Sequence, residues 1–516
     1  MMLFTIGRLT LPELSLLVAT VVGVFLWLAA RRSPYGHLFG PPPTSWLFGS
    51  GREAMDFSIW SQDGGFGEPG LMWLKRYGSV YYYRVLHMHR IVVADPVAIK
   101  HVMVTHGRNY PRAPITRIIS KKLAGGESLL STEGRSHTAL RKLFNPHFGQ
   151  ASVKTMLGIF QHHTNVFMEQ LTAKEPVDLQ NLFTKMTLDV IGVAAFGFDF
   201  QSLLDKNARE IQAYNDIHLT PSFFGIIGFV FLPFYEYLPL ASNRHRAEAQ
   251  AVLQGVIDRV LQQKVAALNS AKARDAPKDI LDLILEQASD MSMADIRAML
   301  LMFMIAGHET TDNTLGWIVS FVAQHPEVAA NVHEECSRMR GDGNNTVPTW
   351  DDLSKLPYLS AVIHESMRLR PTVPELPSRL ALEADMVPLT DGSHLAVPKG
   401  ANIFLDIIAI QRNPTYWSRP NEFLPERFIE GTNTYEADLA LRGGKPNTFC
   451  YFPFGLGDKR CIGNRFSMTE MLVVLSAFFA KYRVALTSAA DVNVRKHTGT
   501  IAPVHLEVHL ASIATK

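Results

Sequence analysis

Hydrophobic and polar positions repeat with two different periods along this chain. Residues 80–85 and 90–94 alternate with the period of two that is typical of strands. After about residue 95, apolar residues recur every three or four positions, which predicts helices, and strand-like pieces return near 396–405 and 504–510. The pattern predicts a mainly α fold with minor β sheets. The clearest predicted helices are 139–144, 179–196, 246–268, 279–287, 292–324, 358–369 and 464–481.

The first thirty residues differ from the rest. Residues 14–30 form an apolar run without a charge, at the short end of what spans a bilayer as a helix. Arg31 and Arg32 follow at once, which predicts that the rest of the chain lies in the cytosol. A cleaved signal peptide is the alternative, but the run is long for a signal core and no small-residue cleavage site precedes the arginines. The run predicts one N-terminal transmembrane helix.

A proline-rich segment separates this anchor from the remainder. Residues 40–43 (Gly-Pro-Pro-Pro) cannot continue a helix and predict a stiff, extended spacer. We therefore expect an anchor at 1–30, a basic and proline-rich hinge at 31–45, and one large folded domain at 46–516. The aromatic segment 220–240 is too broken by prolines to span a membrane, and both a core position and an apolar flap that touches lipid remain open.

Composition narrows the function classes. The formal net charge of +2 on 516 residues gives no reason to expect a nucleic-acid partner. The three cysteines, Cys336, Cys450 and Cys461, are too few for a disulfide framework and fit a reducing compartment. Cys450 lies between two aromatic residues and is expected to be a buried structural cysteine. The sequence contains neither G-x-S-x-G nor H-E-x-x-H, so a hydrolase has no support.

The strongest chemical signal surrounds Cys461. Gly455 and Gly457 permit a tight turn, and the predicted helix 464–481 follows directly. Cys461 is thus expected at a helix N-terminus, where the dipole and free amides favour a thiolate. Without a second ligand-spaced Cys or His, this thiolate suits a haem iron better than tetrahedral zinc. A buried structural cysteine is the alternative.

This loop resembles the haem-binding signature F-x-x-G-x-x-x-C-x-G of the cytochrome P450 family. The resemblance implies a cytochrome P450-like α+β fold after the transmembrane helix, and Cys461 as the axial ligand to the iron of haem b. The family usually has arginine two residues before the cysteine, where this chain has Lys459 followed by Arg460. Either side chain is expected to pair with a haem propionate. The matching positions are Phe454, Gly457, Cys461 and Gly463.

The long predicted helix carries Ala-Gly-His-Glu-Thr-Thr at residues 306–311. A glycine and back-bonding threonines loosen the hydrogen-bond ladder of a buried helix, and a carboxylate beside a hydroxyl suits a proton relay. Taken alone, the motif would indicate only a kinked helix with a glutamate on its surface. By resemblance it is the oxygen-binding helix of the family, which implies that Glu309 and Thr310 are the catalytic acid–alcohol pair.

Further positions match the family in the same order along the chain. Glu365 and Arg368 share a helix face, and with Arg427 in Pro-Glu-Arg-Phe they resemble the structural triad of the family, which serves folding and haem retention. His137 and Arg141, four residues apart, match positions that bind a haem propionate, although the family commonly has tryptophan at the first. The third propionate position is matched by Arg379.

The resemblance also places a substrate pocket. Its residues are apolar or small, which favours a fatty acid, terpenoid, sterol or aromatic substrate. Glu375 is a charge in a segment that is normally apolar. We hypothesise that it anchors a polar or cationic substrate group; the alternative is a carboxylate turned to solvent or neutralised by Arg379. The implied pocket residues are Ile115, Ile118, Phe303, Ala306, Val373, Leu376 and Ile501.

Together these motifs imply a monooxygenase that inserts one oxygen atom of O2 into a hydrophobic substrate by hydroxylation or epoxidation. Electrons would come from NADPH through NADPH–cytochrome P450 reductase, with cytochrome b5 as an optional second partner, at the endoplasmic reticulum membrane. Two alternatives stay open. One is a haem-thiolate isomerase or dehydratase acting on peroxides, whose members typically lack the acid–threonine pair, and the other is a non-catalytic haem-binding protein. The expected docking face for the reductase is Lys142, Lys459, Arg460 and Arg465.

Overall fold

The computed structural model describes most of the chain after the predicted anchor. It describes residues 35–513 apart from 63, 206–211, 214–224, 226–227, 229–234, 269–278, 288–290, 341–346, 447–448 and 497–498, and before residue 35 it describes Gly23 alone. The anchor predicted at 14–30 and most of the aromatic segment 220–240 therefore lie outside the described residues. Within those residues, none of the helices combines the length and the apolar character needed to cross a membrane.

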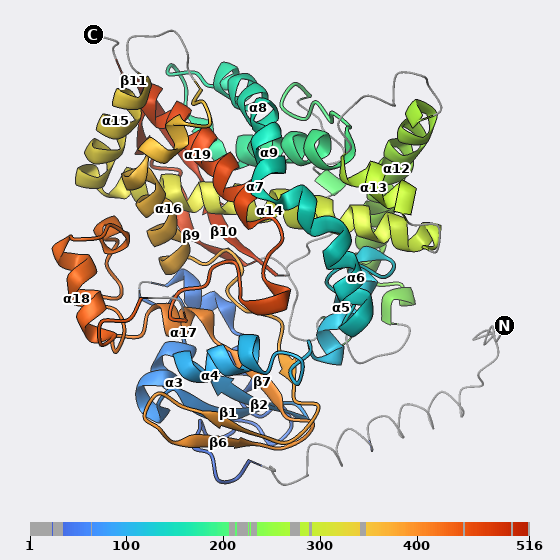
Figure 1. Cartoon of the computed structure of the whole chain (residues 1–516), viewed down its shortest axis with the longest axis vertical. Coiled ribbons are helices and arrows are strands. Elements are labelled where there is room, and N and C mark those ends of the chain that lie inside the picture. The colour runs from blue at the N-terminus through green and yellow to red at the C-terminus, as the bar shows by residue number, and fades with distance from the viewer. Residues whose placement is uncertain are drawn as a thin grey trace.

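Helices dominate the described chain (Figure 1), as the hydrophobic pattern predicts. Helices α9 (Leu179–Phe196) and α19 (Asn464–Lys481) begin and end at the predicted residues. The long α14 (Met293–Gln324) begins at the predicted cap, where the Ser292 side chain accepts a hydrogen bond from the Asp295 amide. The remaining α-helices are α2 (Gly51–Ala54), α3 (Gly70–Tyr77), α4 (Pro96–Lys100), α5 (Pro114–Ala124), α6 (Gly134–Phe144), α7 (Gln150–Thr155), α8 (Leu157–Gln170), α12 (Ala241–Leu268), α13 (Ile280–Gln287), α15 (Pro326–Arg340), α16 (Pro357–Leu369), α17 (Ile407–Gln411) and α18 (Asn433–Leu441).

Short helical turns join these helices. The turn η3 (His101–Thr105) is π-helical and continues directly from α4. The other turns are 3-10 helices: η2 (Phe57–Ser61), η4 (Asn145–Phe148), η5 (Tyr235–Tyr237), η7 (Asp352–Lys355), η8 (Pro425–Phe428) and η9 (Gly457–Lys459).

The strands form small sheets. In the largest, β1 (Val80–Val85) pairs antiparallel with β2 (Met88–Val93), β2 parallel with β7 (Asn402–Leu405), and β7 antiparallel with β4 (Arg379–Leu380). Figure 1 shows this sheet with α3 and α4 at one end of the molecule, while α14 runs through the centre of the helical part. The other strands are β3 (Val177–Asp178), β5 (Asp385–Pro388), β6 (His394–Val397), β8 (Tyr482–Leu486), β9 (Asp491–Lys496), β10 (Ile501–His505) and β11 (Glu507–Ser512).

Two predicted strand segments each contain parts of two strands. Segment 396–405 is divided by a turn at Gly400, whose φ of +81° favours glycine. Segment 504–510 is divided at Leu506, whose carbonyl leaves the ladder and accepts a hydrogen bond from the Leu179 amide. The alternation of apolar residues continues through Leu506, which is why a period of two did not reveal that division. At the first turn, Pro398, Lys399 and Gly400 interrupt the alternation.

Residues of the predicted hinge 31–45 pack against the main sheet. Tyr35 is 5% exposed and belongs to the core cluster under the main sheet. The Tyr82 amide donates to the Phe39 carbonyl at 3.0 Å, and a Cβ on Gly40 would lie only 1.8 Å from the Tyr82 carbonyl oxygen. Part of the proline-rich hinge is therefore held along β1, because a residue without a side chain permits the close approach.

The largest core cluster brings α8, α9, α14, α16 and α19 together. At Gly307 in the middle of α14, a Cβ would lie 2.7 Å from the Ile191 side chain of α9. This glycine lets the two helices approach closely, and close packing fixes the position of the motif that α14 carries. The two elements with the strongest chemical signals, α14 and the start of α19, thus belong to one rigid core.

Candidate functional site

The loop before α19 positions Cys461. Its amide donates to the Phe454 carbonyl at 2.8 Å, and Gly455 and Gly457 both have a φ of +67°. A Cβ on Gly457 would lie 2.0 Å from the Met103 carbonyl oxygen of η3, so only glycine fits where the two segments meet. Helix α19 starts at Asn464 with Gly463 as its N-cap. Cys461 therefore lies just before a helix N-terminus, as predicted.

The three cysteines have different surroundings. Cys461 is exposed, whereas Cys336 and Cys450 are buried. Burial raises the pKa of Cys450 to about 12, which suits an inert structural thiol. Burial by the protein around Cys461 raises the pKa of its thiol, and the Gly463 amide and the guanidinium groups of Arg141 and Arg460 offset this rise in part. Cys461 alone thus combines accessible surface with an amide donor and positive charge, as a thiolate ligand requires.

Helix α14 has a short accessible strip in an otherwise buried stretch. Ala306 is exposed and Gly307 and Thr310 are half-buried, while the flanking turns are buried. The Thr310 hydroxyl donates to the Ala306 carbonyl at 2.9 Å, and the Thr311 hydroxyl donates to the Gly307 carbonyl at 3.2 Å. The predicted back-bonding is therefore present. It leaves small side chains facing the accessible side in the middle of the helix.

The predicted acid–alcohol pair faces two directions. Thr310 lies on the accessible strip, whereas Glu309 is 6% exposed and its Oε1 accepts a hydrogen bond from the Thr500 hydroxyl. Glu309 is thus a buried carboxylate, and the surface glutamate of the alternative interpretation is excluded by this geometry.

Two further buried carboxylates, which the motifs did not reveal, lie close to Glu309 and to each other. Asp312 is 3% exposed and accepts a hydrogen bond from the Thr184 hydroxyl at 2.6 Å. Burial raises the pKa of Asp312 well above its usual range, and Glu309 raises it further. Glu470 of α19 is 1% exposed, and burial together with Asp312 raises its pKa well above its usual range. In the sequence, each of these two carboxylates is a charged residue within a largely apolar predicted helix, and this signal would have indicated Asp312 and Glu470.

Arg379 and His137 supply unpaired buried donors. Arg379 is 3% exposed, and its Nε and Nη1 have no hydrogen-bond partner among the described residues. His137 is 4% exposed and its Nε2 is also unpaired there. Unpaired buried polar atoms cost free energy, so such atoms call for a ligand. These two residues were predicted to bind a haem propionate, and a carboxylate fits their donors.

The protonation state of His137 follows from its burial. Burial and the nearby charge of Arg112 lower the pKa of His137 to about 4. The imidazole is therefore neutral at neutral pH and has one N–H to donate. A neutral ring still supports the predicted hydrogen bond to a propionate, without an added charge.

Glu133 holds two cations beside this pair of donors. It lies 3.0 Å from Arg112 Nη1 and 3.2 Å from Lys459 Nζ. Lys459 therefore points inward, away from the predicted docking face. The Arg141 Nη1 donates to the Arg460 carbonyl at 2.9 Å, which ties α6 to the cysteine loop. No sequence motif indicated Arg112 or Glu133, because their pairing depends on segments distant in the chain.

The structure brings the predicted triad together. Arg368 Nε and Nη2 lie 2.6 Å and 2.8 Å from the two oxygens of Glu365, and Arg427 Nε lies 3.0 Å from Glu365 Oε1. All three side chains are 0% exposed. Asp438 of α18 forms a second ion pair with Arg427 and is a buried member that the motifs did not indicate. This network ties α16, η8 and α18 together.

The predicted pocket residues do not share one environment. Phe303 is 8% exposed and packs against Phe144, with ring centroids 5.1 Å apart. Ile501 has no exposed surface, because its side chain belongs to a core cluster with Trp317, whose indole donates to the Ile501 carbonyl at 3.2 Å. This geometry gives no support for a ligand contact by Ile501. The positions with accessible surface are Ile115, Ile118, Ala306, Val373 and Leu376.

Glu375 pairs with Lys496 and not with Arg379, the partner considered from the sequence. Its Oε2 lies 3.4 Å from Lys496 Nζ, and its side chain is 41% exposed. Lys496 also lies 3.4 Å from the centroid of the Phe57 ring, a cation–π contact that holds the ammonium in place. Neutralisation by Arg379 is therefore wrong, since Lys496 takes that role. A contact between Glu375 and a substrate stays a prediction.

The comparisons with known proteins agree on one class. The family model described as "Cytochrome P450" matches residues 68–508. Cytochrome P450 monooxygenase 205 of Postia placenta is 28% identical, over 96% of this chain and 94% of that protein. Cytochrome P450 monooxygenase claQ of Ampulloclitocybe clavipes is 28% identical over 89% of each chain, and cytochrome P450 4A24 of Sus scrofa is 28% identical over 92% of this chain and 94% of its own.

The mainly helical fold, the accessible cysteine and these matches define a haem-thiolate monooxygenase, an oxidoreductase. The chain belongs to the cytochrome P450 family. Haem is therefore its cofactor, and the residues present fit it. Cys461 would supply the sulfur ligand, while Arg379 and His137 would donate to a propionate.

Proposed function

We propose that this chain is a membrane-anchored monooxygenase that inserts one oxygen atom of O2 into a fatty acid, terpenoid, sterol or aromatic substrate. Hydroxylation and epoxidation are both within this chemistry. Electrons would come from NADPH through NADPH–cytochrome P450 reductase. The observation that carries the proposal is the accessible strip around Thr310 in an otherwise buried stretch of α14, in a chain whose accessible cysteine has an amide donor and positive charge beside it.

The bound haem supplies oxygen binding and activation. The chain's own residues move the protons. The Thr310 hydroxyl, which donates to the Ala306 carbonyl here, can turn to donate to a ligand on the accessible side. Close to Glu309, burial favours the protonated forms of Asp312 and Glu470, since it raises their pKa values well above the usual range. These two carboxyl groups form a proton reserve beside Glu309, and the buried surroundings exclude bulk water from it.

Thr310→Val tests the proton role. The change keeps the shape of the side chain and removes its hydroxyl, so we expect product formation from NADPH, reductase and O2 to fall by about 10²- to 10⁴-fold. Thr311→Val is the matched control, because the Thr311 hydroxyl also donates to a helix carbonyl but the residue is 2% exposed. Equal loss in both variants would show that only the helix geometry matters.

The same assay separates the alternatives. Product that depends on NADPH and reductase supports the monooxygenase. Rearrangement of a peroxide substrate without NADPH would indicate the isomerase or dehydratase. A haem spectrum with neither activity, across a panel of the four substrate classes, would leave a haem-binding protein and contradict the proposal.

We also propose that residues 1–30 anchor the chain in the endoplasmic reticulum membrane, with the catalytic domain in the cytosol. The apolar run before Arg31 and Arg32 supports this orientation. The exposed residues Lys142, Arg460 and Arg465 offer a basic face to an acidic surface on the reductase or cytochrome b5.

Deletion of residues 1–30 tests the anchor. We expect the shortened chain to leave the microsomal fraction in a high-salt wash, while the full chain stays bound. Protease added to intact microsomes should digest the catalytic domain of the full chain. A domain that survives until detergent is added would place it in the lumen and refute the orientation.

A further inference from the structure

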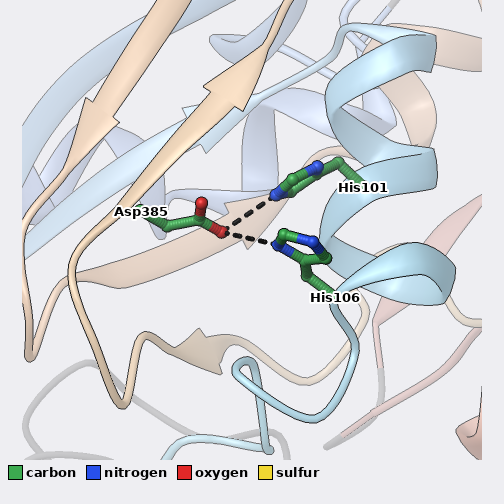
Figure 2. Close-up of side chains that lie close together, drawn as sticks. All are labelled: His101, His106 and Asp385. Carbon is green, nitrogen blue, oxygen red and sulfur yellow. Dashed lines mark hydrogen bonds and ion pairs between the residues drawn. The ribbon is translucent and has the colours of Figure 1, made fainter.

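A second cluster of ligand-type side chains lies on the turn that packs against the cysteine loop. His101 starts the π-helical turn η3, His106 follows its end, and Asp385 starts β5 (Figure 2). Asp385 Oδ2 lies 2.9 Å from His101 Nε2 and 3.3 Å from His106 Nδ1. One potential ligand atom from each residue lies within 4.8 Å of the others. None of the motifs of the haem site includes these residues.

The π turn explains why two histidines five residues apart meet. The His106 amide donates to the His101 carbonyl at 2.8 Å, an i to i+5 hydrogen bond. In an α-helix, residues five apart point to different faces, whereas the wider turn places residue i+5 beside residue i. The two imidazole centroids are accordingly 4.0 Å apart. Turns of this kind are rare and frequently mark functional sites.

The carboxylate is held in a fixed orientation. The Tyr110 hydroxyl donates to Asp385 Oδ2 at 2.9 Å, and the Met386 amide donates to Oδ1 at 2.8 Å. The carboxylate is therefore supported by hydrogen bonds from outside the cluster, as metal-binding carboxylates are.

We propose that His101, His106 and Asp385 bind a divalent transition-metal ion, Zn²⁺ in the first place. Two imidazole nitrogens and one carboxylate oxygen form a donor set that zinc commonly takes from protein. Tetrahedral donors at zinc bond lengths lie about 3.3 Å apart, close to the two separations measured from Asp385 Oδ2. The His106 side chain is 49% exposed, which gives the ion a route from solvent and leaves room for a water as fourth ligand.

A metal ion at this site would stabilise η3, the turn against which the cysteine loop packs. It would join η3 to β5, and β5 pairs with β6 in a hairpin. On another side of η3, the Met103 carbonyl faces Gly457 so closely that no side chain fits between them. The site therefore lies outside the haem site but on the segment against which the cysteine loop rests. The alternative is a hydrogen-bonded His–Asp cluster that binds no metal.

Zinc binding to the haem-loaded full chain tests the proposal. The chain is prepared in detergent without a histidine tag, washed with a chelator and dialysed against ZnCl2, and the bound zinc is measured per chain. We expect one tight ion in the wild type. His106→Ala and Asp385→Asn should each weaken its affinity by at least about 100-fold, and Tyr110→Phe by about tenfold, as loss of an outer-layer partner does.

His394→Ala is the matched control, because it removes an exposed histidine from the adjacent strand β6 without touching the cluster. It should bind zinc as the wild type does. The haem spectrum of each variant reports whether it is folded, and Co²⁺ in place of Zn²⁺ should give the intense visible bands of a tetrahedral site. Binding that is absent, or equal in the wild type and the folded His106→Ala and Asp385→Asn variants, overturns the proposal. These readouts do not depend on turnover, so they stand apart from the monooxygenase assay.

Discussion

Cys461→Ala is expected to abolish the strongly red-shifted Soret band that the reduced protein shows with carbon monoxide, and to reduce product formation to background. The band reports a thiolate on the haem iron, and the thiolate drives the O–O cleavage that oxygen insertion requires. Cys461 is the one exposed cysteine among the three, all of which the structure describes. The measurement is a visible difference spectrum of the purified, haem-loaded protein beside the wild type.

Cys450→Ala is the control for this spectrum. Cys450 is only eleven positions away in the sequence, yet it is 5% exposed and its pKa is raised to about 12. Its removal should leave the red-shifted band intact and affect only packing. A wild-type protein with an unshifted haem band, or a shifted band that survives in Cys461→Ala, would mean that another group binds the iron.

Glu365→Gln is expected to lower the free energy of unfolding by about 3–5 kcal/mol, the usual effect of breaking a buried ion pair. The change leaves Arg368 and Arg427, both 0% exposed, without the carboxylate that neutralises them. Arg427 keeps its ion pair with Asp438, so Arg368 bears most of the loss. Urea unfolding of the haem-loaded protein, followed by the haem band, measures both stability and haem retention.

The exposed pair of Arg419 and Glu422 provides the comparison. Their charged atoms lie 3.3 Å apart with both side chains more than half exposed. Solvent screens such a pair, so Glu422→Gln should change the free energy of unfolding by at most about 1 kcal/mol. If Glu365→Gln were equally mild, the buried network would not have the structural role assigned to it.

Local signals in the sequence were sufficient for the elements with strong periodicity or caps. Helices α9 and α19 and the cap of α14 at Ser292 follow from residues close together in the chain. The division at Leu506 was missed because the apolar alternation runs through it. Such a break becomes visible only once the partner strands are known.

In the candidate site, the sequence could identify the residues that belong to family motifs. The meeting of Glu365, Arg368 and Arg427 agrees with their motif. The inward orientation of Lys459 was not predictable, because it depends on Glu133, more than three hundred residues earlier in the chain. The cluster around Asp385 was missed for the same reason, because Asp385 is 284 positions after His101. In addition, His101 and His106 meet through a π turn that no local pattern announces.

The pairing of Glu133 with both Arg112 and Lys459 has a consequence for biosynthesis. The ribosome delivers Arg112 and Glu133 more than three hundred residues before Lys459 and Cys461. The earlier part can form helices during translation, but Glu133 lacks its second cation until the cysteine loop has been synthesised. Cofactor capture must therefore wait for the cysteine loop, and a product that terminates before this loop would lack both the sulfur ligand and Lys459.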